Sequence, residues 1–472
     1  MALVRLPLEL LSEICSYLCP HCLRTPEDEL ETLDFDLDPW GFKYEPLLSD
    51  RKRIKQQNLL SLSQVCKVLH AAAEPFLYHY IPGNRYKDLQ LVRRTLKERP
   101  DLQLRVSELE TAVNGRIEQM PDPASPEGLP FGYPGDPSPT KLSLYWKEVM
   151  MLLKFVPKLQ RFHFCMPKPN PSTFGLPEIR TWPTPPLTSL RELAISTLEH
   201  HCGFQHGFQL ERAGCILSAA PNLEILQCSR CIGVSENFRE YYLTQPVPLQ
   251  HLTELILVDS RLTPASFRNL LSAVGPGLSK VRIQQSRRVL WKSDWEGVPP
   301  EDNEIKLDGV AAALQPWRHS LKELTFSMEG GEFPENFDDT QEATLLRELG
   351  ALEVLRTQVA LFDWDGDPDG NVLVRTLPQS LRHLELRGYA DFACGLLMLY
   401  DAITERGHFR HLQRIDIDDQ KYDRSTPFGQ AYATELDENC ATLASAGVEV
   451  VKYPAEEWSD PGSNRARSLV SD

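Results

Sequence analysis

The residues best suited to metal chemistry lie near the start of the chain, in the segment CPHC at positions 19–22. Cys19 and Cys22 offer two thiolates at a spacing that is common in zinc sites. A structural zinc site uses four ligands, and no second Cys-x-x-Cys pair lies nearby. Three other residues are candidates to complete the set: Cys15, His21 and Cys66. The residues favour a loop turned by Pro20 with buried thiols, and a zinc site is the alternative.

Signatures of independent catalysis are missing from the sequence. It contains no phosphate-binding loop, no Gly-x-Ser-x-Gly turn, no His-Glu-x-x-His helix and no dinucleotide-binding glycine pattern. The segment EHHCGFQH at 199–206 is a second histidine-rich tract, which we interpret as a surface loop. We therefore expect no catalytic residue, no cofactor and no resident metal. A metal-dependent enzyme built on 19–22 or on the histidine tract is the rival interpretation.

Apolar helical patterns lie on either side of CPHC. Residues 8–18 carry apolar side chains at the i, i+3/i+4, i+7 spacing of one helical face, directly after Pro7, which suits a helix start. The same spacing recurs over 59–69, and a further short apolar stretch follows it. A unit of this size buries little apolar surface by itself. Its apolar stripe is therefore either covered by the rest of the chain or offered to a partner.

The segments LPLELLSEICSYL and LLSLSQVCKVLHAAAEPFLYHYI resemble the two halves of an F-box, particularly the variant of filamentous fungi. The resemblance implies a helical domain over residues 1–81 that binds the Skp adaptor of a Skp–cullin–F-box ubiquitin ligase. A compact F-box has only a short turn where this chain has an insertion at 19–56, which either leaves the docking surface open or lies across it. The resemblance implies adaptor contacts from nine residues: Leu6, Pro7, Leu10, Ile14, Leu59, Leu62, Val65, Cys66 and Leu69.

Most of the remaining chain repeats one pattern, Leu-x-x-Leu-x-Leu, with other apolar residues allowed at the leucine positions. Copies begin at residues 106, 159, 190, 223, 252, 278, 321, 352, 381, 412 and 448. Alternation within each copy predicts a short strand, and helical stretches such as TPASFRNLLSAVG lie between copies. A strand, a turn and a helix repeated roughly every thirty residues are typical of a leucine-rich-repeat solenoid. An ordinary α/β domain with parallel strands is the alternative.

We therefore predict an α/β fold in which the helical domain of residues 1–81 precedes a leucine-rich-repeat solenoid over 82–454. Short parallel strands would line the concave face and helices the convex face. Two proline-rich stretches, 121–139 and 166–186, read as loops, and the tail 455–472 reads as disordered.

Polar residues between the leucines of each strand are expected to face the concave side. A wide surface of mixed charge suits a protein or peptide ligand better than a small molecule. The candidate substrate-binding residues are Arg230, Arg282, Gln284, Arg356, Glu385, Arg387, Asp416 and Asp418. The alternative is that each is a solvated strand residue without a binding role.

Charge and composition limit the partners. The net charge of −16 repels a phosphate backbone, so we expect no nucleic acid. No apolar run is long enough to span a bilayer and the N-terminus is not a signal peptide, so we expect no membrane association and a cytoplasmic or nuclear location. The eleven cysteines form no tight framework, which favours reduced thiols.

A small apolar docking unit followed by a long recognition array predicts a substrate receptor. We expect the N-terminal helices to bind a Skp-type adaptor, itself carried on a cullin scaffold, and the repeats to bind an unidentified protein substrate. Ubiquitin transfer would be catalysed by partner subunits, so the chain itself would not be an enzyme. The alternative is a free-standing leucine-rich-repeat scaffold for protein assembly, without a link to a ligase.

Overall fold

The computed structural model describes fourteen parts of the chain, which carry all the elements below: residues 6–22, 44–83, 86–111, 139–166, 185–197, 205–234, 249–286, 289–290, 305–329, 344–358, 362, 371–387, 393–419 and 427–454. The chain divides into two compact units, the first comprising residues 1–200 and 210–227, the second 201–209 and 228–472. The predicted loops at 121–139 and 166–186 fall almost wholly outside the described residues, as does the predicted tail. In the described parts, no helix is both long and apolar enough to cross a membrane.

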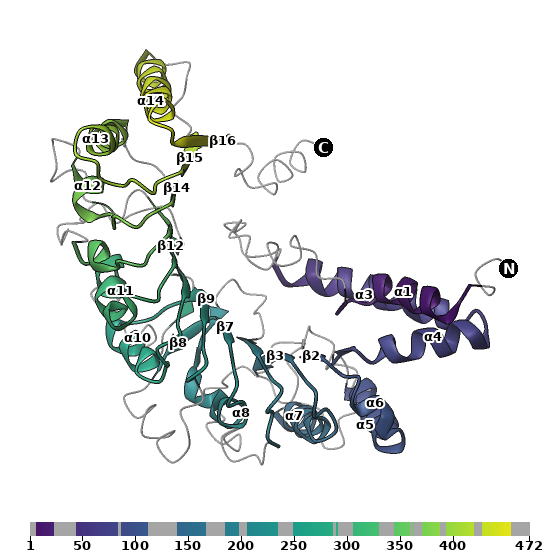
Figure 1. Ribbon diagram of the computed structural model, residues 1–472. Helices are drawn as coiled ribbons and strands as arrows, with labels where there is room; N and C mark the ends of the chain where they lie inside the picture. Colours follow the sequence, from purple (N-terminus) through teal and green to yellow (C-terminus); the bar gives the residue numbers. More distant parts are fainter. Residues whose placement is uncertain are drawn as a thin grey trace, which may run out of the picture. The chain divides into compact units, whose positions relative to one another are not determined.

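Three helices open the first unit: α1 (Leu8–Leu18), α3 (Tyr44–Ser63) and α4 (Lys67–Leu77) (Figure 1). The predicted helix at 8–18 is confirmed. The single pattern expected over 59–69 proves to span two helices, because the chain turns at 64–66 and Cys66 adopts an extended backbone as the N-cap of α4. Ser63 closes α3 by donating its hydroxyl hydrogen to the carbonyl oxygen of Leu60, at 2.6 Å.

Much of the expected insertion at 19–56 is structured. Residues 19–22 form a turn after α1, and residues 44–56 belong to α3. The sequence did not show this part of α3 because it carries few apolar residues at helical spacing. Polar contacts hold it instead: Lys52 lies 2.5 Å from Glu108 and 3.7 Å from Glu110, and Gln56 donates to the Tyr80 carbonyl at 3.0 Å. These bonds join α3 to the first two strands.

The helices α1, α3 and α4 pack around a small apolar core. Its fully buried members are Leu11, Cys15, Leu59, Leu69, Ala72 and Ala73. Six other side chains are partly buried against it: Leu6, Leu18, Leu62, Cys66, Phe76 and Leu77. At about 1.5–3 kcal/mol for each large apolar side chain, three leucines together with one cysteine and two alanines stabilise these helices only modestly.

Twelve strands form one parallel sheet, and eleven of them are strands that the alternating pattern predicts. Each strand begins one or two residues after the start of its repeat: β2 (Glu108–Thr111), β3 (Arg161–Met166), β4 (Glu192–Thr197), β7 (Ile225–Ser229), β9 (Glu254–Ser260), β10 (Lys280–Ser286), β12 (Glu323–Glu329), β13 (Val354–Gln358), β14 (His383–Arg387), β15 (Arg414–Asp419) and β16 (Glu449–Pro454). The twelfth strand, β1 (Tyr80–Pro82), pairs with β2 at the sheet edge. The expected domain boundary at 81 therefore falls within a strand.

Leucine-type residues at the repeat starts form the core beneath the sheet. All eleven are buried: Val106, Leu159, Leu190, Leu223, Leu252, Leu278, Leu321, Leu352, Leu381, Leu412 and Val448. Burial of each one therefore stabilises the fold by about 2 kcal/mol. Because this residue must point inward, it fixes the register of the strand that follows it.

Helices connect the strands. In the first unit these are α5 (Tyr86–Glu98), α6 (Pro100–Gln103), α7 (Pro139–Leu153) and α8 (Gly214–Ala219), with the 3₁₀ segment η4 (Leu210–Ala213). The second unit has α10 (Pro264–Leu271), α11 (Leu307–Ala313), α12 (Val372–Thr376), α13 (Ala393–Thr404) and α14 (Pro427–Ser445), with η7 (Gln315–Trp317) and η8 (Thr344–Glu348). Within the second unit, the helices lie along one side of the strands (Figure 1). The fold is thus mixed α/β with a large parallel sheet.

Two small parallel pairs complete the second unit. The strand β5 (Gln205–His206) pairs with β11 (Val289–Leu290), and β6 (Phe208–Gln209) pairs with β8 (Cys231–Gly233). Residues 205–206 and 208–209 are therefore paired with later strands of the second unit, and the last two residues of the predicted surface loop at 199–206 form a strand.

Candidate functional site

Helix α1 carries two apolar stripes, and only one of them is used by the core. Leu11 and Cys15 point into the core and are fully buried. Leu10 and Tyr17, seven residues apart and therefore on one face, are 45% and 58% exposed, with half-buried Ile14 between them. The helix thus presents an outward apolar stripe that no described part of the chain covers.

The turn between α3 and α4 repeats this arrangement. Leu59 and Leu69 are buried, at 0% and 2% exposure, whereas Leu60, Val65 and Val68 are exposed, Val65 to 67%. Isolated exposed apolar residues are ordinary on a protein surface. Here they gather on the three helices of one small unit, which favours an interaction surface.

The nine residues that the F-box resemblance implies as adaptor contacts fall into three groups. Pro7, Leu10 and Val65 are exposed, and Leu6, Ile14, Leu62 and Cys66 are partly buried. Leu59 and Leu69 lie in the core, so they stabilise the helices and present no surface to a partner. Sequence reasoning missed five exposed apolar residues of these helices: Leu8, Tyr17, Ile54, Leu60 and Val68. Their positions beside the inward stripe are the signal that could have identified them.

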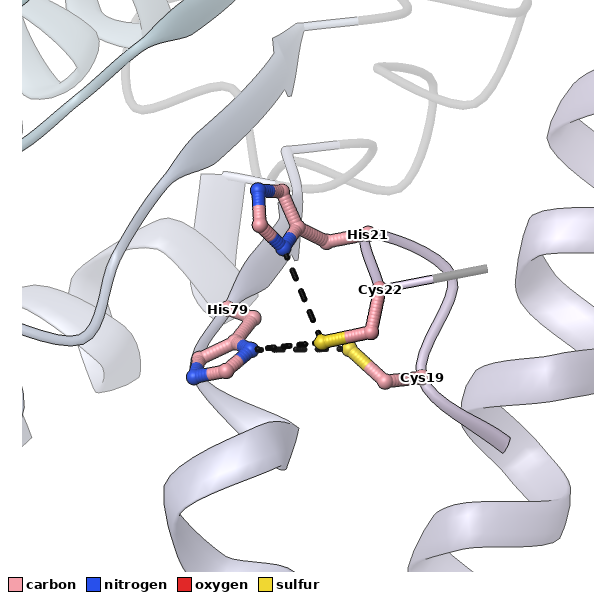
Figure 2. Close-up of side chains that lie close together, drawn as sticks. All are labelled: Cys19, His21, Cys22 and His79. Atoms are coloured by element: carbon pink, nitrogen blue, oxygen red, sulfur yellow. Dashed lines mark hydrogen bonds between the residues drawn. The ribbon is translucent and has the colours of Figure 1, made fainter. Parts of the chain in front are cut away.

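The side chains of Cys19, His21, Cys22 and His79 meet where α1 ends (Figure 2). Their potential ligand atoms all lie within 4.8 Å of one another. The Nδ1 atom of His79 is 3.4 Å from the Cys22 sulfur and 3.7 Å from the Cys19 sulfur, and the Nδ1 atom of His21 is 3.8 Å from the Cys22 sulfur. The two imidazole rings meet edge to face, with centroids 5.5 Å apart. The cluster thus combines Cys19, His21 and Cys22 of CPHC with His79, which lies 57 residues after Cys22.

Local structure positions both halves of this Cys/His cluster. Cys19 caps α1 with extended backbone, donating its N–H to the Ser16 carbonyl. His79 follows α4, and its carbonyl accepts from the N–H groups of Ser107 and Glu108 at the start of β2. The cluster therefore joins the end of α1 to the junction between α4 and the sheet. Cys15 and Cys66, considered from the sequence as further ligands, are not members of it.

Proximity changes the acidity of the two thiols. A hydrogen bond with Cys22 and then burial raise the pKa of Cys19 to about 12. The same hydrogen bond lowers the pKa of Cys22 to about 7, with burial opposing the change. The nine cysteines that the structure describes are free thiols. Cys22 is exposed, so it is the accessible thiol of the pair.

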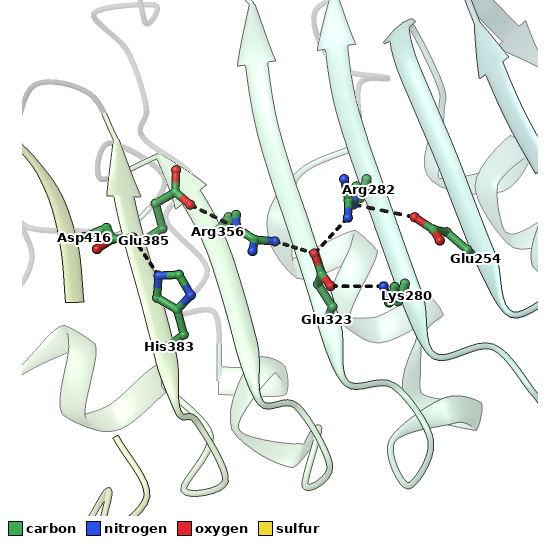
Figure 3. Close-up of polar contacts among 8 residues, drawn as sticks. All are labelled: Glu254, Lys280, Arg282, Glu323, Arg356, His383, Glu385 and Asp416. Atoms are coloured by element: carbon green, nitrogen blue, oxygen red, sulfur yellow. Dashed lines mark hydrogen bonds and ion pairs between the residues drawn. The ribbon is translucent and has the colours of Figure 1, made fainter. Parts of the chain in front are cut away.

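The second unit presents a line of charged side chains along neighbouring strands, which we call the charge ladder (Figure 3). Register places Arg356 of β13 beside Glu385 of β14, and Glu385 beside Asp416 of β15. Arg356 forms an ion pair with Glu385 at 3.0 Å and a second with Glu323 of β12. The ladder comprises Glu254, Lys280, Arg282, Glu323, Arg356, His383, Glu385, Arg414 and Asp416.

Glu323 is the branch point of the ladder. Its carboxylate lies 3.2 Å from Arg282 and 3.8 Å from Lys280, and it accepts a hydrogen bond from Arg356. Burial tends to raise the pKa of Glu323, but Arg356 and Arg282 outweigh it and the pKa is lowered overall. The pKa of Asp416 is lowered in the same way: burial tends to raise it, but His383 at 2.8 Å and Arg414 at 2.7 Å lower it overall.

The structure brings together four of the eight candidate substrate-binding residues: Arg282, Arg356, Glu385 and Asp416 are all in the ladder. Gln284 is 1% exposed and Arg230 is buried, with a left-handed backbone at φ 70°. The side chains of Arg387 and Asp418 fall outside the described set, although their backbones lie in β14 and β15. His383, Glu385 and Asp416 also lie close enough to hold a metal. However, the negative charge of Glu385 is already balanced by Arg356, and that of Asp416 by Arg414.

Two comparisons with known proteins give no match. A scan of the sequence against protein-family models finds no match, and a search of curated proteins finds no significant relative.

Proposed function

We propose that this protein is the substrate-recognition subunit of a Skp–cullin–F-box ubiquitin ligase. The N-terminal helices dock a Skp-type adaptor, which a cullin scaffold carries, and the repeat region binds a target protein. The chain supplies no catalytic group of its own. It raises the local concentration of the target's lysines near the catalytic subunits.

The observation that carries the proposal is the outward apolar stripe of α1, together with the exposed residues of α3, α4 and their connecting turn. Burying a large apolar side chain stabilises an interface by about 1.5–3 kcal/mol at most. Leu10, Tyr17, Leu60, Val65 and Val68 therefore offer enough apolar surface for a specific contact once ordering costs are met. This surface belongs to the segments that resemble an F-box.

The repeat region is proposed to be a leucine-rich-repeat solenoid. Eleven strands that each begin at nearly the same position of the repeat support this assignment, since every repeat buries its own first apolar residue. Doubly wound α/β sheets carry helices on both faces. In the second unit the helices lie on one side, which leaves the other side of the strands for recognition (Figure 1).

The target surface is proposed to include the charge ladder. Its ion pairs hold Arg282, Arg356, Glu385 and Asp416 in fixed positions, so a target would meet an ordered pattern of charge rather than flexible side chains. Arg282 and Arg356 retain partial exposure through which a partner's carboxylates can make contact.

The test compares adaptor binding by the full chain and by Leu10→Asp combined with Val65→Asp. Both side chains are exposed, so the pair of changes should leave the helical content unchanged while weakening adaptor binding by at least about 100-fold, or about 2.7 kcal/mol. Leu91→Asp on α5 is the matched control, because Leu91 is similarly exposed but lies outside the three helices. Binding by the double variant equal to that of the control would refute the docking surface. Failure of the unaltered chain to bind any Skp-type adaptor would favour the free-standing scaffold.

A further inference from the structure

We infer that Cys19, His21, Cys22 and His79 form a structural zinc site that fastens the end of α1 to the junction between α4 and β1. The sequence favours a loop with buried thiols at CPHC, because no second Cys-x-x-Cys pair lies nearby. The structure supplies His79, from the segment LYHYI that the F-box resemblance used only as an apolar helix end. The inference does not depend on the proposed function.

The distances within the cluster match those between the ligands of a tetrahedral zinc ion. With Zn–S near 2.3 Å and Zn–N near 2.05 Å, tetrahedral geometry places sulfur and nitrogen ligands about 3.6 Å apart and two sulfurs about 3.8 Å apart. Three of the four sulfur–nitrogen distances are 3.4, 3.7 and 3.8 Å. All four potential ligand atoms fit within 4.8 Å, so they surround one small volume. Figure 2 shows the Nδ1 atoms of both histidines directed toward the sulfur of Cys22.

The donor set selects zinc among the common divalent ions. Two thiolates and two imidazoles form the Cys₂His₂ set of structural zinc sites, whereas magnesium and calcium prefer oxygen ligands. Two thiolates also balance the charge of Zn²⁺, and neutral imidazoles add none. A neutral complex is compatible with a site in which Cys19 is fully buried.

A closed set of four protein ligands indicates a structural role rather than a catalytic one, because no coordination position remains for water or substrate. The elements that the site joins need such a connection. In the part of the chain that the structure describes, six residues are fully buried in the core of α1, α3 and α4, and residues 19–22 form a turn directly after α1. Zinc bound at the end of α1 would hold that helix, and its outward stripe, in place.

Redox exchange between a dithiol and a disulfide is the alternative to zinc binding for Cys19 and Cys22. A Cys-x-x-Cys pair with one exposed thiol can also exchange between a dithiol and a disulfide. Formation of that disulfide would consume both sulfur ligands. The oxidation state of the two sulfurs therefore separates the two readings.

The experiment uses the full chain, purified under reducing conditions from zinc-supplemented medium and desalted at neutral pH. Elemental analysis should find one zinc per chain, and replacement by cobalt should give visible absorption bands of tetrahedral Co²⁺ with a thiolate charge-transfer band. Cys22→Ser and His79→Asn should each weaken zinc affinity at least about 100-fold. Cys66→Ser and His70→Asn are matched controls, since both residues lie in or beside α4 and outside the cluster.

Chelation provides a second readout that does not depend on how the variants fold. Removing zinc from the unaltered chain should accelerate hydrogen exchange in α1 and leave the strands β9 to β16 unaffected, because all four proposed ligands belong to the first unit. Zinc retained equally by all four variants would overturn the assignment. So would a zinc-free reduced chain that shows no cobalt bands, or a freshly purified chain in which Cys19 and Cys22 form a disulfide.

Discussion

Neutralising Glu323 should destabilise the centre of the second unit. The change Glu323→Gln keeps the shape of the side chain and removes the charge that Arg282, Arg356 and Lys280 share. Glu323 and Arg282 are only 13% and 12% exposed, so solvent screens their attraction weakly. The two arginines would be left close together without a counter-charge.

The structure gives the magnitude of this effect. A pair of unit charges 3.2 Å apart interacts with about 5 kcal/mol at an effective dielectric constant near 20, which is an upper bound. Desolvation of the carboxylate and the partial exposure of Arg356 offset part of it, and glutamine can still accept a hydrogen bond. We expect a loss of about 2 kcal/mol in the free energy of opening of β12 and β13 at pH 7.

Native-state hydrogen exchange, resolved to peptides of β12 and β13, measures this loss. Glu353→Gln is the matched control, because the ion pair of Glu353 with Arg382 is 3.7 Å long and well exposed, so its loss should cost less than about 0.5 kcal/mol. The pKa of Glu323 is lowered in the folded state, so its charge stabilises above the unfolded pKa of about 4.3 and ceases to do so as the pH falls. The difference between wild type and Glu323→Gln should therefore narrow below about pH 4. Equal losses from the two variants, or a difference independent of pH, would refute the argument.

Two further changes test the packing of the second unit. Burial raises the pKa of Asp308 to about 6, although Lys306 opposes the shift, so the ionised carboxylate destabilises the folded state above that pH. Urea denaturation of Asp308→Asn should therefore show a free energy of unfolding that is higher by about 1 kcal/mol at pH 8 and almost unchanged near pH 4. Gly275→Ala would place a Cβ atom 2.1 Å from the Gln250 carbonyl oxygen and should destabilise by about 3 kcal/mol. Gly350→Ala, whose Cβ meets nothing within 4 Å, should change stability by less than about 1 kcal/mol in the same titration, and equal effects of the two glycine changes would contradict this reasoning.

The strands could be predicted from the sequence because their signal is local. Alternating leucines mark each inward position, and all eleven repeats become strands of one parallel sheet. The N-terminal part of α3 could not be predicted in this way. Its stabilising contacts come from Glu108 and Tyr80, which are more than twenty residues away in sequence and are polar. Apolar periodicity does not report such contacts.

The candidate sites show the same limit. The residues of CPHC favour a loop with buried thiols and leave a zinc site as the alternative, and the nearby imidazole of His79 becomes evident only when α1 and α4 pack together. Likewise, the repeat pattern placed Arg282, Arg356, Glu385 and Asp416 on one face, and register then decides which of them pair. The sequence therefore predicts membership of a face, and the tertiary structure determines the contacts within it.

The central claim is that the outward surface of α1, α3 and α4 is completed by another polypeptide. Hydrogen exchange of the full chain, with and without a purified Skp-type adaptor, tests it most directly. We expect the amides of α1 and of the turn at 64–66 to exchange rapidly in the free chain and to slow at least about tenfold when the adaptor is added, while those of β9 to β16 do not change. Helices that are already fully protected in the free chain, with no change on adding the adaptor, would contradict it.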